Sequence, residues 1–252
     1  MAVQLNPMEQ FELKRFIPLH LFGYDVSFTN QSLMMVIVVV AVSLFLTLAM
    51  SRRSLVPSRA QSMAELSYEF VANMINAAAG EDGLVFFPFV FTIFMFVLFC
   101  NFFGLVPWTF TVTSQIAVTF ALAAVVILTV VVTGFVKHGI KFLMLFVPKA
   151  PIYLLILLVP IEIVSFLTRP ISLSVRLFAN MLAGHTMLQV FAGFIIALGT
   201  AGGILSALSI APLLLLIAIM ALEVLVAALQ AYVFAILTCI YLNEALHLHD
   251  HH

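Results

Sequence analysis

The sequence predicts an all-α integral membrane protein with about five membrane-crossing segments and one amphipathic helix on the membrane surface. Three observations support this fold class. Hydrophobic residues make up 64% of the 252 positions and charged residues only 8%, compared with about 25% charged residues in soluble domains. The apolar residues gather in runs that are long enough to cross a bilayer. Basic residues concentrate in two loops that lie two crossings apart, as expected for loops on the cytoplasmic side.

The first segment of the chain is a short arm, residues 1–30, followed by an apolar run over residues 31–50. The arm lacks the basic start and continuous apolar core of a signal peptide. The run has the length that a helix rising about 1.5 Å per residue needs to cross a hydrocarbon core of about 30 Å. Arg52, Arg53 and Arg59 follow it, so this loop is expected in the cytoplasm and the arm outside.

Residues 62–79 are predicted to form a helix along the membrane surface. Apolar and polar positions recur there at three- and four-residue steps on opposite faces, and Ser62 and Glu65 have the spacing of a capping box. Residues 84–136 then contain no charged side chain, and the stretch is too long for one crossing. We expect a hairpin of two spans with its turn near Pro107 and Trp108.

The second half of the chain is predicted to contain two long helices. A basic loop with Lys137, Lys141 and Lys149 precedes them. Residues 150–198 would extend for roughly 70 Å as one helix, so this helix must be strongly tilted, kinked at its prolines, or both. A glycine-rich break separates it from the last helix, residues 204–243, which we also expect to be strongly tilted. Five crossings place the C-terminus in the cytoplasm, within a single membrane domain over residues 1–252.

The two long helices carry polar residues in regular positions. A charged residue at the centre of a membrane helix costs on the order of 3 kcal/mol, so it rarely persists without a partner or a function. Glu162, Arg169 and Arg176 are spaced by seven, which keeps them within about 20° per step on one helix face. A series at steps of four runs along nearly the same face: Ser172, Arg176, Asn180 and Gly184.

The last helix repeats this pattern, because Glu223 and Gln230 are also seven residues apart among apolar neighbours. Two such stripes indicate a shared aqueous interior. The small residues Ala179, Ala183 and Gly184 would let another helix approach closely.

Arg176 has a chemistry that suits a barrier to protons. Arginine stays charged in proteins, whereas a buried lysine can lose its proton. A carboxylic acid in lipid keeps its proton because desolvation disfavours the charged form, and a nearby arginine would draw it back to the ionised form. Acid and imidazole side chains, here Glu223 with His185 and separately Glu162, would relay protons toward the cation from the two membrane faces.

At these residues the chain resembles subunit a of the F-type rotary ATP synthases, in the form found in alphaproteobacteria and mitochondria. The resemblance is carried by PIEIVSFLTRPISLSVRLFANMLAGH (160–185) together with LEVLVAALQAYVFAILTCIYL (222–242). It extends over most of the chain, including the turn motif NFFGLVP at 101–107, where Gly104 replaces the Asp of some members. The pattern SLxxRLFxNxxAG is long and specific.

The resemblance implies a proton-translocating stator subunit with two offset half-channels that lead to and from the carboxylates of a rotating ring of c subunits. Arg176 is similar to the essential arginine that faces this ring and separates the half-channels. Asn180 and Gln230 match polar residues close to it. His185 and Glu223 match an interacting pair in the half-channel from the outer, high-proton side, and this pair favours protons over sodium as the transported ion.

Three further positions are assigned by the same resemblance. Glu162 and Ser172 match positions toward the other half-channel, and Arg169 occupies a basic position of the motif. The family also implies b-type peripheral stalk subunits and the rest of the ATP synthase as partners, in the bacterial inner membrane or, alternatively, the mitochondrial one. Such a subunit is not an enzyme by itself. We expect no cofactor, no metal and, from the net charge of −1, no nucleic acid.

Other interpretations of these residues remain open from the sequence. Arg176 would be structural if it formed an ion pair with Glu162 or Glu223. Independently, Arg169 would reach toward the headgroups instead of serving the channel. His185 with Glu223, and Asn180 with Gln230, would serve as interhelical contacts. At the level of the chain, a self-contained proton-coupled solute transporter predicts internal repeats, and we find none. A purely structural anchor gives no reason for two ionisable stripes.

Overall fold

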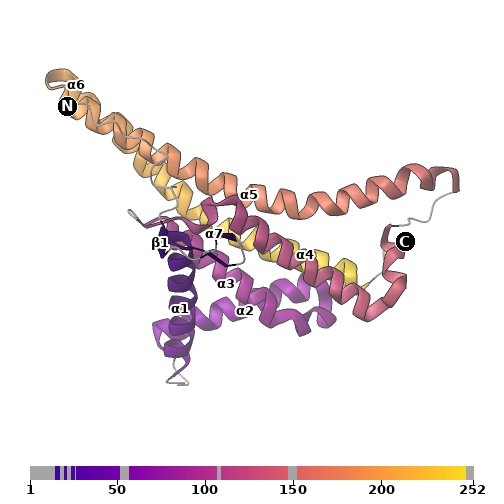
Figure 1. The fold of residues 1–252 in the computed structure, drawn as a ribbon. Coiled ribbons are helices and arrows are strands. Elements are labelled where there is room, and N and C mark those ends of the chain that lie inside the picture. The colour runs from indigo at the N-terminus through magenta and orange to yellow at the C-terminus, as the bar shows by residue number, and fades with distance from the viewer. Residues whose placement is uncertain are drawn as a thin grey trace. The chain divides into compact units, whose positions relative to one another are not determined.

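The computed structural model describes residues 15–17, 20–21, 24–25, 27–51, 57–106, 109–146 and 152–247. Within these residues the chain is dominated by helices (Figure 1). Five of the helices in this described part are long and apolar enough to cross a membrane, so the predicted all-α membrane fold is confirmed. Arg52, Arg53, Lys149 and the predicted turn at Pro107 and Trp108 lie outside the described residues.

Short strands occur in the N-terminal arm, where the sequence showed no strand pattern. β1 (Arg15–Ile17) pairs antiparallel with β4 (Phe28–Thr29), and β2 (His20–Leu21) pairs antiparallel with β3 (Tyr24–Asp25). Strands of two or three residues are too short to show an alternating pattern in the sequence. The first long helix, α1, follows as Asn30–Met50.

The helix predicted for the membrane surface, α2, covers Arg59–Gly83 and begins one turn earlier than expected. Ser58 caps it, because its side chain accepts a hydrogen bond from the backbone N–H of Gln61 at 3.3 Å. The predicted capping box of Ser62 and Glu65 was therefore wrong, and the Glu65 carboxylate accepts a bond from the Gln61 amide instead. Near its end α2 is broken by Gly80, which has a φ of 66°, a conformation that glycine adopts readily.

Two helices of continuous apolar sequence cover the region of the predicted hairpin. A short 3₁₀ helix, η2 (Leu84–Phe86), leads into α3 (Phe87–Gly104), and α4 (Ile116–His138) follows. Between them lies a second short 3₁₀ helix, η3 (Val112–Ser114). After α4 the chain continues in η4 (Gly139–Phe146).

The two long helices of the second half are α5 (Ile152–Thr200) and α7 (Ile210–Leu246), with the short α6 (Gly203–Leu208) between them. Pro160 and Pro170 both lie inside α5 without ending it. The glycine-rich break contains Gly202 and Gly203 with φ of 72° and 61°. The last helix is thus divided at Ser209 rather than running unbroken from residue 204, and its main part continues to Leu246.

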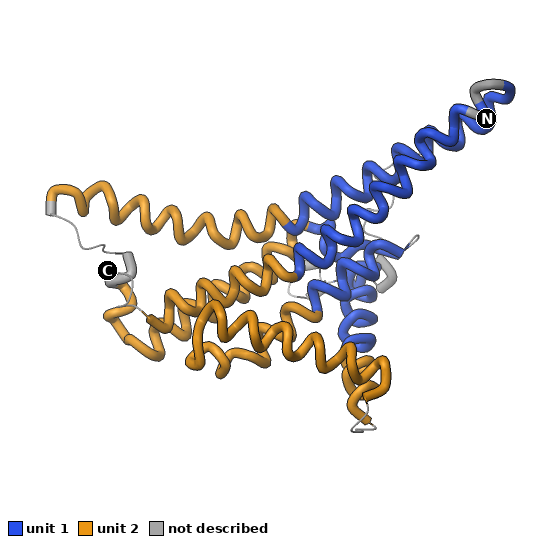
Figure 2. Tube along the Cα trace, turned by 180° about the vertical axis from the view of Figure 1, so that it is seen from behind, with its two compact units in different colours: residues 1–42, 96–115, 177–231 blue, residues 43–95, 116–176, 232–252 orange. Residues whose placement is uncertain are grey.

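The contacts divide the chain into two compact units, coloured separately in Figure 2. Unit 1 comprises residues 1–42, 96–115 and 177–231, and unit 2 comprises residues 43–95, 116–176 and 232–252. Unit 1 buries Cys100, Leu177 and Met181, and unit 2 buries Val71, Phe142 and Phe234, as examples. The predicted single membrane domain stays a prediction.

Within unit 2, Gly134 allows the end of α4 to pack against η4. A Cβ at this position would lie 2.2 Å from the ring of Phe142, and that ring is only 1% exposed. Overpacking of a filled core typically costs about 1–3 kcal/mol. We therefore expect Gly134→Ala to lower the melting temperature of the purified chain in detergent by several degrees.

The two cysteines offer a direct measurement of this melting, because Cys100 and Cys239 are both free and buried and react with a thiol-specific dye only on unfolding. Gly199→Ala is the matched control, since no atom lies within 4 Å of a Cβ built at Gly199 in α5. Equal melting temperatures for the two variants would contradict the packing argument.

Candidate functional site

The predicted pair of His185 and Glu223 is brought together inside unit 1 by α5 and α7. His185 is 9% exposed and Glu223 is 5% exposed, and Nε2 of the histidine lies 3.7 Å from Oε1 of the glutamate. Both carboxyl oxygens of Glu223 are enclosed, and neither accepts a hydrogen bond within the described residues. A buried acid without hydrogen-bond donors around it is stable only when it is neutral or hydrated.

Gly184 creates the space in which this carboxyl group lies. A Cβ at Gly184 would lie 2.6 Å from Oε1 and 2.9 Å from Cδ of Glu223. The sequence singled out Gly184 as a small residue that admits a neighbouring helix, and the structure shows that its neighbour is the Glu223 side chain. The acid is therefore held directly against the backbone of α5.

Asn180 and Gln230 also meet in unit 1. The Asn180 amide donates a hydrogen bond to Oε1 of Gln230 at 2.9 Å. Gln230 is buried, and its own Nε2 makes no hydrogen bond within the described residues. This leaves one amide donor in the interior available to a water molecule or to another acceptor.

Arg176 lies in α5 four residues before Asn180, and its side chain is exposed. In the part of the chain that the structure describes, it forms no ion pair and no hydrogen bond. The structural alternative, an ion pair with Glu162 or Glu223, is therefore not found among these residues. The nearby positions at helical spacing, Ala179 and Ala183, are exposed as well, so small residues flank the cation.

Arg169 is held in unit 2 by an acid that the sequence analysis missed. Its guanidinium donates to Oε2 of Glu244 on α7. It also lies over the rings of Tyr241 and Phe166, at 5.2 Å and 5.7 Å from their centroids. Glu244 follows Glu223 by three heptads on the same helix, and this spacing was a signal that would have indicated its place on the polar stripe.

Glu162 and Ser172 are not brought together by the structure. Glu162 is half-buried, and no hydrogen bond or ion pair joins it to any other described residue; Ser172 is exposed. The serine that packs inside unit 2 is Ser174, whose hydroxyl lies 3.1 Å from that of Thr119. The assignments of Glu162 and Ser172 stay predictions.

The sequence analysis also missed polar residues that lie beside the histidine and glutamate. Thr111 contacts His185 through its hydroxyl at 3.3 Å, and Asn101 donates to the backbone oxygen of Ala227 on α7. Both residues belong to the uncharged hairpin region, where we interpreted the polar residues simply as part of a turn. Their signal was that hydroxyl and amide residues interrupt an otherwise apolar run, at Asn101 and again at TFTVTSQ, residues 109–115.

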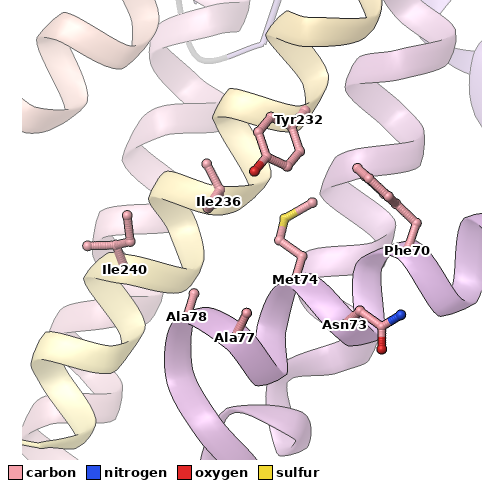
Figure 3. Close-up of a pocket in the computed structure, with 8 residues that line it drawn as sticks. All are labelled: Phe70, Asn73, Met74, Ala77, Ala78, Tyr232, Ile236 and Ile240. Carbon is pink, nitrogen blue, oxygen red and sulfur yellow. The ribbon is translucent and has the colours of Figure 1, made fainter.

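A separate cavity of about 440 Å³ lies in unit 2 between α2 and α7 (Figure 3). None of its eight lining residues is charged, and none belongs to the polar stripes: Phe70, Asn73, Met74, Ala77, Ala78, Tyr232, Ile236 and Ile240. The cavity is therefore distinct from the candidate site.

Comparison with known proteins identifies the family. The family model described as ATP synthase A chain matches residues 32–243. This chain belongs to that family. The ATP synthase subunit a of Mesorhizobium japonicum is 58% identical over 247 residues, which are 98% of each chain. That of Chelativorans sp. is 60% identical and that of Agrobacterium fabrum 57%, each over 243 residues, which are 96% of this chain and 98% of the relative.

The resemblance predicted from the sequence is thus confirmed. A member of the ATP synthase A chain family is a proton-translocating subunit of the membrane sector, and it is a channel subunit of the complex, not an enzyme by itself. With its five apolar helices, this chain is a multi-pass protein of the bacterial inner membrane.

The contact of Gly184 with Glu223 leads to a prediction. Gly184→Ala must displace the carboxyl group of Glu223 from its present position, because the new methyl group would lie within 3 Å of it. For the proton relay that the sequence analysis predicts at this pair, a displacement of about 1 Å is a large perturbation. We expect passive proton conduction of membrane vesicles to fall on the order of tenfold, a change of about 1.4 kcal/mol. Gly199→Ala, on the same helix, should conduct normally, and equal conduction by both variants would contradict the geometry.

Proposed function

We propose that this chain conducts protons through two offset half-channels, which lead to and from the carboxylates of a ring of c subunits and are separated by Arg176. Proton flow through the half-channels would turn the ring and thereby drive ATP synthesis. Each charge that crosses 100 mV supplies about 2.3 kcal/mol, so several protons are needed for each ATP.

The observation that carries this proposal is the exposed guanidinium of Arg176. It lies on an apolar helix, yet no acid in the described part of its own chain neutralises it. Such a cation in a membrane helix needs a partner or a function, because it costs on the order of 3 kcal/mol. A carboxylate from a neighbouring subunit supplies that partner, and the exposed Ala179 and Ala183 leave space for a helix to bring it close.

The outer half-channel would end at His185 and Glu223. An imidazole and a carboxyl group at 3.7 Å need only a small movement to exchange a proton. Asn180 and Gln230, joined by a hydrogen bond, follow on α5 and α7 in the direction of Arg176. Their polar groups would hold water on the path between the pair and the ring.

The inner half-channel would lie on the other side of Arg176. Glu162 precedes the arginine by about four helical turns and His185 follows it by about two and a half, so the two proton carriers flank the cation along α5. Ser172 is exposed on the same stretch. The ion pair of Arg169 with Glu244 would hold α5 and α7 together there while exposing polar groups to the path.

The proposal includes an orientation, based on the basic loops, and partners, based on the family resemblance. The N-terminal arm would lie outside and the C-terminus in the cytoplasm, because the two basic loops favour the cytoplasmic side. Besides the c ring, b-type subunits of the peripheral stalk would hold the chain stationary while the ring turns.

Replacing the arginine tests the proposal directly. Arg176→Ala removes the fixed cation, so ring carboxylates would pass without releasing their protons. We expect coupled ATP synthesis to be abolished in membranes that still contain the assembled complex, as measured on native gels. Arg59→Ala is the control, because Arg59 is an exposed cation of α2 outside the proposed path. Normal synthesis by an assembled Arg176→Ala enzyme would refute the proposal.

The exposed face of α5 provides a second prediction. In a background without native cysteines, Ala179→Cys should form crosslinks to a cysteine placed beside the ring carboxylate of a co-purifying small proteolipid. Met181→Cys is the matched control, since Met181 lies two residues away and is buried. Crosslinking is read as a shifted band on a gel; equal yields at both positions would mean that this face does not meet the ring.

A further inference from the structure

A cluster of buried hydroxyl and amide groups lies between α3 and α4, in a region without any charged residue. Asn101 and Thr113 are fully buried, and Thr111 and Ser114 nearly so. Buried polar groups are normally hydrogen-bonded, and each exception destabilises the fold. An apolar hairpin does not need four such residues in order to turn. The hydrogen-bond partners of these residues therefore indicate what they position.

The cluster is anchored to α7 close to Glu223. The Thr113 hydroxyl donates to Oδ1 of Asn101 at 3.0 Å, and Nδ2 of Asn101 donates to the backbone oxygen of Ala227 at 3.1 Å. Ala227 lies one helical turn after Glu223. Because a carbonyl oxygen has two lone pairs, it can accept this bond in addition to its helical one. The segment that carries Thr111 is therefore fixed relative to the helix that carries the acid.

Thr111 itself is held so that its hydroxyl faces the histidine. Ser114 donates to the Thr111 backbone oxygen at 2.6 Å. A Cβ at Gly104 would lie 2.8 Å from the Thr111 methyl group, so glycine at this position leaves space for the threonine. The Thr111 hydroxyl then lies 3.3 Å from Nε2 of His185. This is the same nitrogen that faces Glu223 at 3.7 Å.

We propose that Thr111 is a positioning residue of the proton path, whose hydroxyl satisfies Nε2 of His185 both with and without its proton. The inference rests on the proposed outer half-channel. A hydroxyl can donate to a bare ring nitrogen or accept from a protonated one, whereas a carboxylate can only accept. When the proton moves from His185 to Glu223, the Nε2–H bond breaks and an O–H bond forms at Oε1. The Thr111 hydroxyl then rotates and donates to the lone pair left on Nε2.

Without this hydroxyl, Nε2 of the deprotonated imidazole would lose the hydrogen bond that Thr111 donates to it. The protonated imidazole would keep Glu223 as its partner, so the protonated form would be favoured. Glu223 is the charged group that faces Nε2 from α7, and residues 84–136, which include α3 and the cluster, contain no charged side chain. The loss of the hydroxyl should therefore slow the release of the proton and keep the pair protonated to a higher pH.

The experiment measures passive proton conduction through the complete membrane sector in vesicles, after the soluble part of the enzyme has been removed, between about pH 6 and 9. This range spans the usual titration range of an imidazole on its alkaline side. Thr111→Val keeps the shape of the side chain and removes the hydroxyl. We expect about tenfold slower conduction, with the pH of half-maximal conduction shifted upward. Thr111→Ser keeps the hydroxyl and should recover most of the rate and the original pH profile.

Thr186→Val is the matched control, because Thr186 adjoins His185 while its hydroxyl, among the described residues, donates to the backbone oxygen of Leu182 on its own helix. If Thr111→Val fails to assemble, Thr111→Ala is compared with Thr111→Ser, since these two differ only in the hydroxyl. Unchanged conduction without the hydroxyl, or equal impairment of the variants with and without it, would overturn the inference.

Glu223→Gln separates this inference from the proposed function. Loss of conduction in Glu223→Gln together with normal conduction in Thr111→Val would remove only the role of Thr111. Normal conduction and synthesis in both Glu223→Gln and Arg176→Ala would instead remove the half-channels, and the role of Thr111 with them.

Discussion

The close approach of the Glu223 carboxyl group to the backbone of Gly184 is the contact on which the candidate site depends. It places an acid inside an apolar helix pair, where neither carboxyl oxygen accepts a hydrogen bond from the described residues. An acid in such a place is stable when neutral, and it ionises only when a positive group or water stabilises the charge. The contact therefore places the carboxyl group next to an imidazole, His185, and this pair is the basis of the proposed outer half-channel.

Two kinds of ionisable residue can be distinguished in α5. Arg169 is satisfied within its own unit, by the Glu244 carboxylate and two aromatic rings. Arg176, seven residues later on the same helix, is exposed and lacks such a partner in the described chain. Both residues carry the same charge, so the difference lies in their surroundings. A paired cation holds two helices together, and the unpaired one is the residue for which we propose a partner acid in another subunit.

The hydrogen bonds around Asn101 show how uncharged polar groups in an apolar hairpin hold a loop against a neighbouring helix. Thr113, Asn101 and the Ala227 carbonyl form a chain of bonds that does not depend on any charge. Neutral groups of this kind cost less to bury than ions, provided that all of them find partners. They fix the distance between a loop and a helix without adding an ionisable group.

The amino-acid sequence by itself determined the membrane fold, the approximate spans and the polar stripes of α5 and α7. These features depend on the length of apolar runs and on helical periodicity, which are local properties of the chain. The pairs of residues seven apart also indicated which faces would be polar. The start of α2 at Arg59, earlier than predicted, was decided by Ser58 rather than Ser62 capping the helix, a choice that local patterns leave open.

Only the tertiary structure decided which polar residues meet. The sequence did not reveal that Arg169 pairs with Glu244, that Ser174 rather than Ser172 is buried, or that Thr111 faces His185. Each of these contacts joins residues from separate elements, so it depends on the rotation and depth at which two helices pack. Packing is set by the sum of many apolar contacts and by gaps such as that at Gly184, and no single stretch of sequence contains that information.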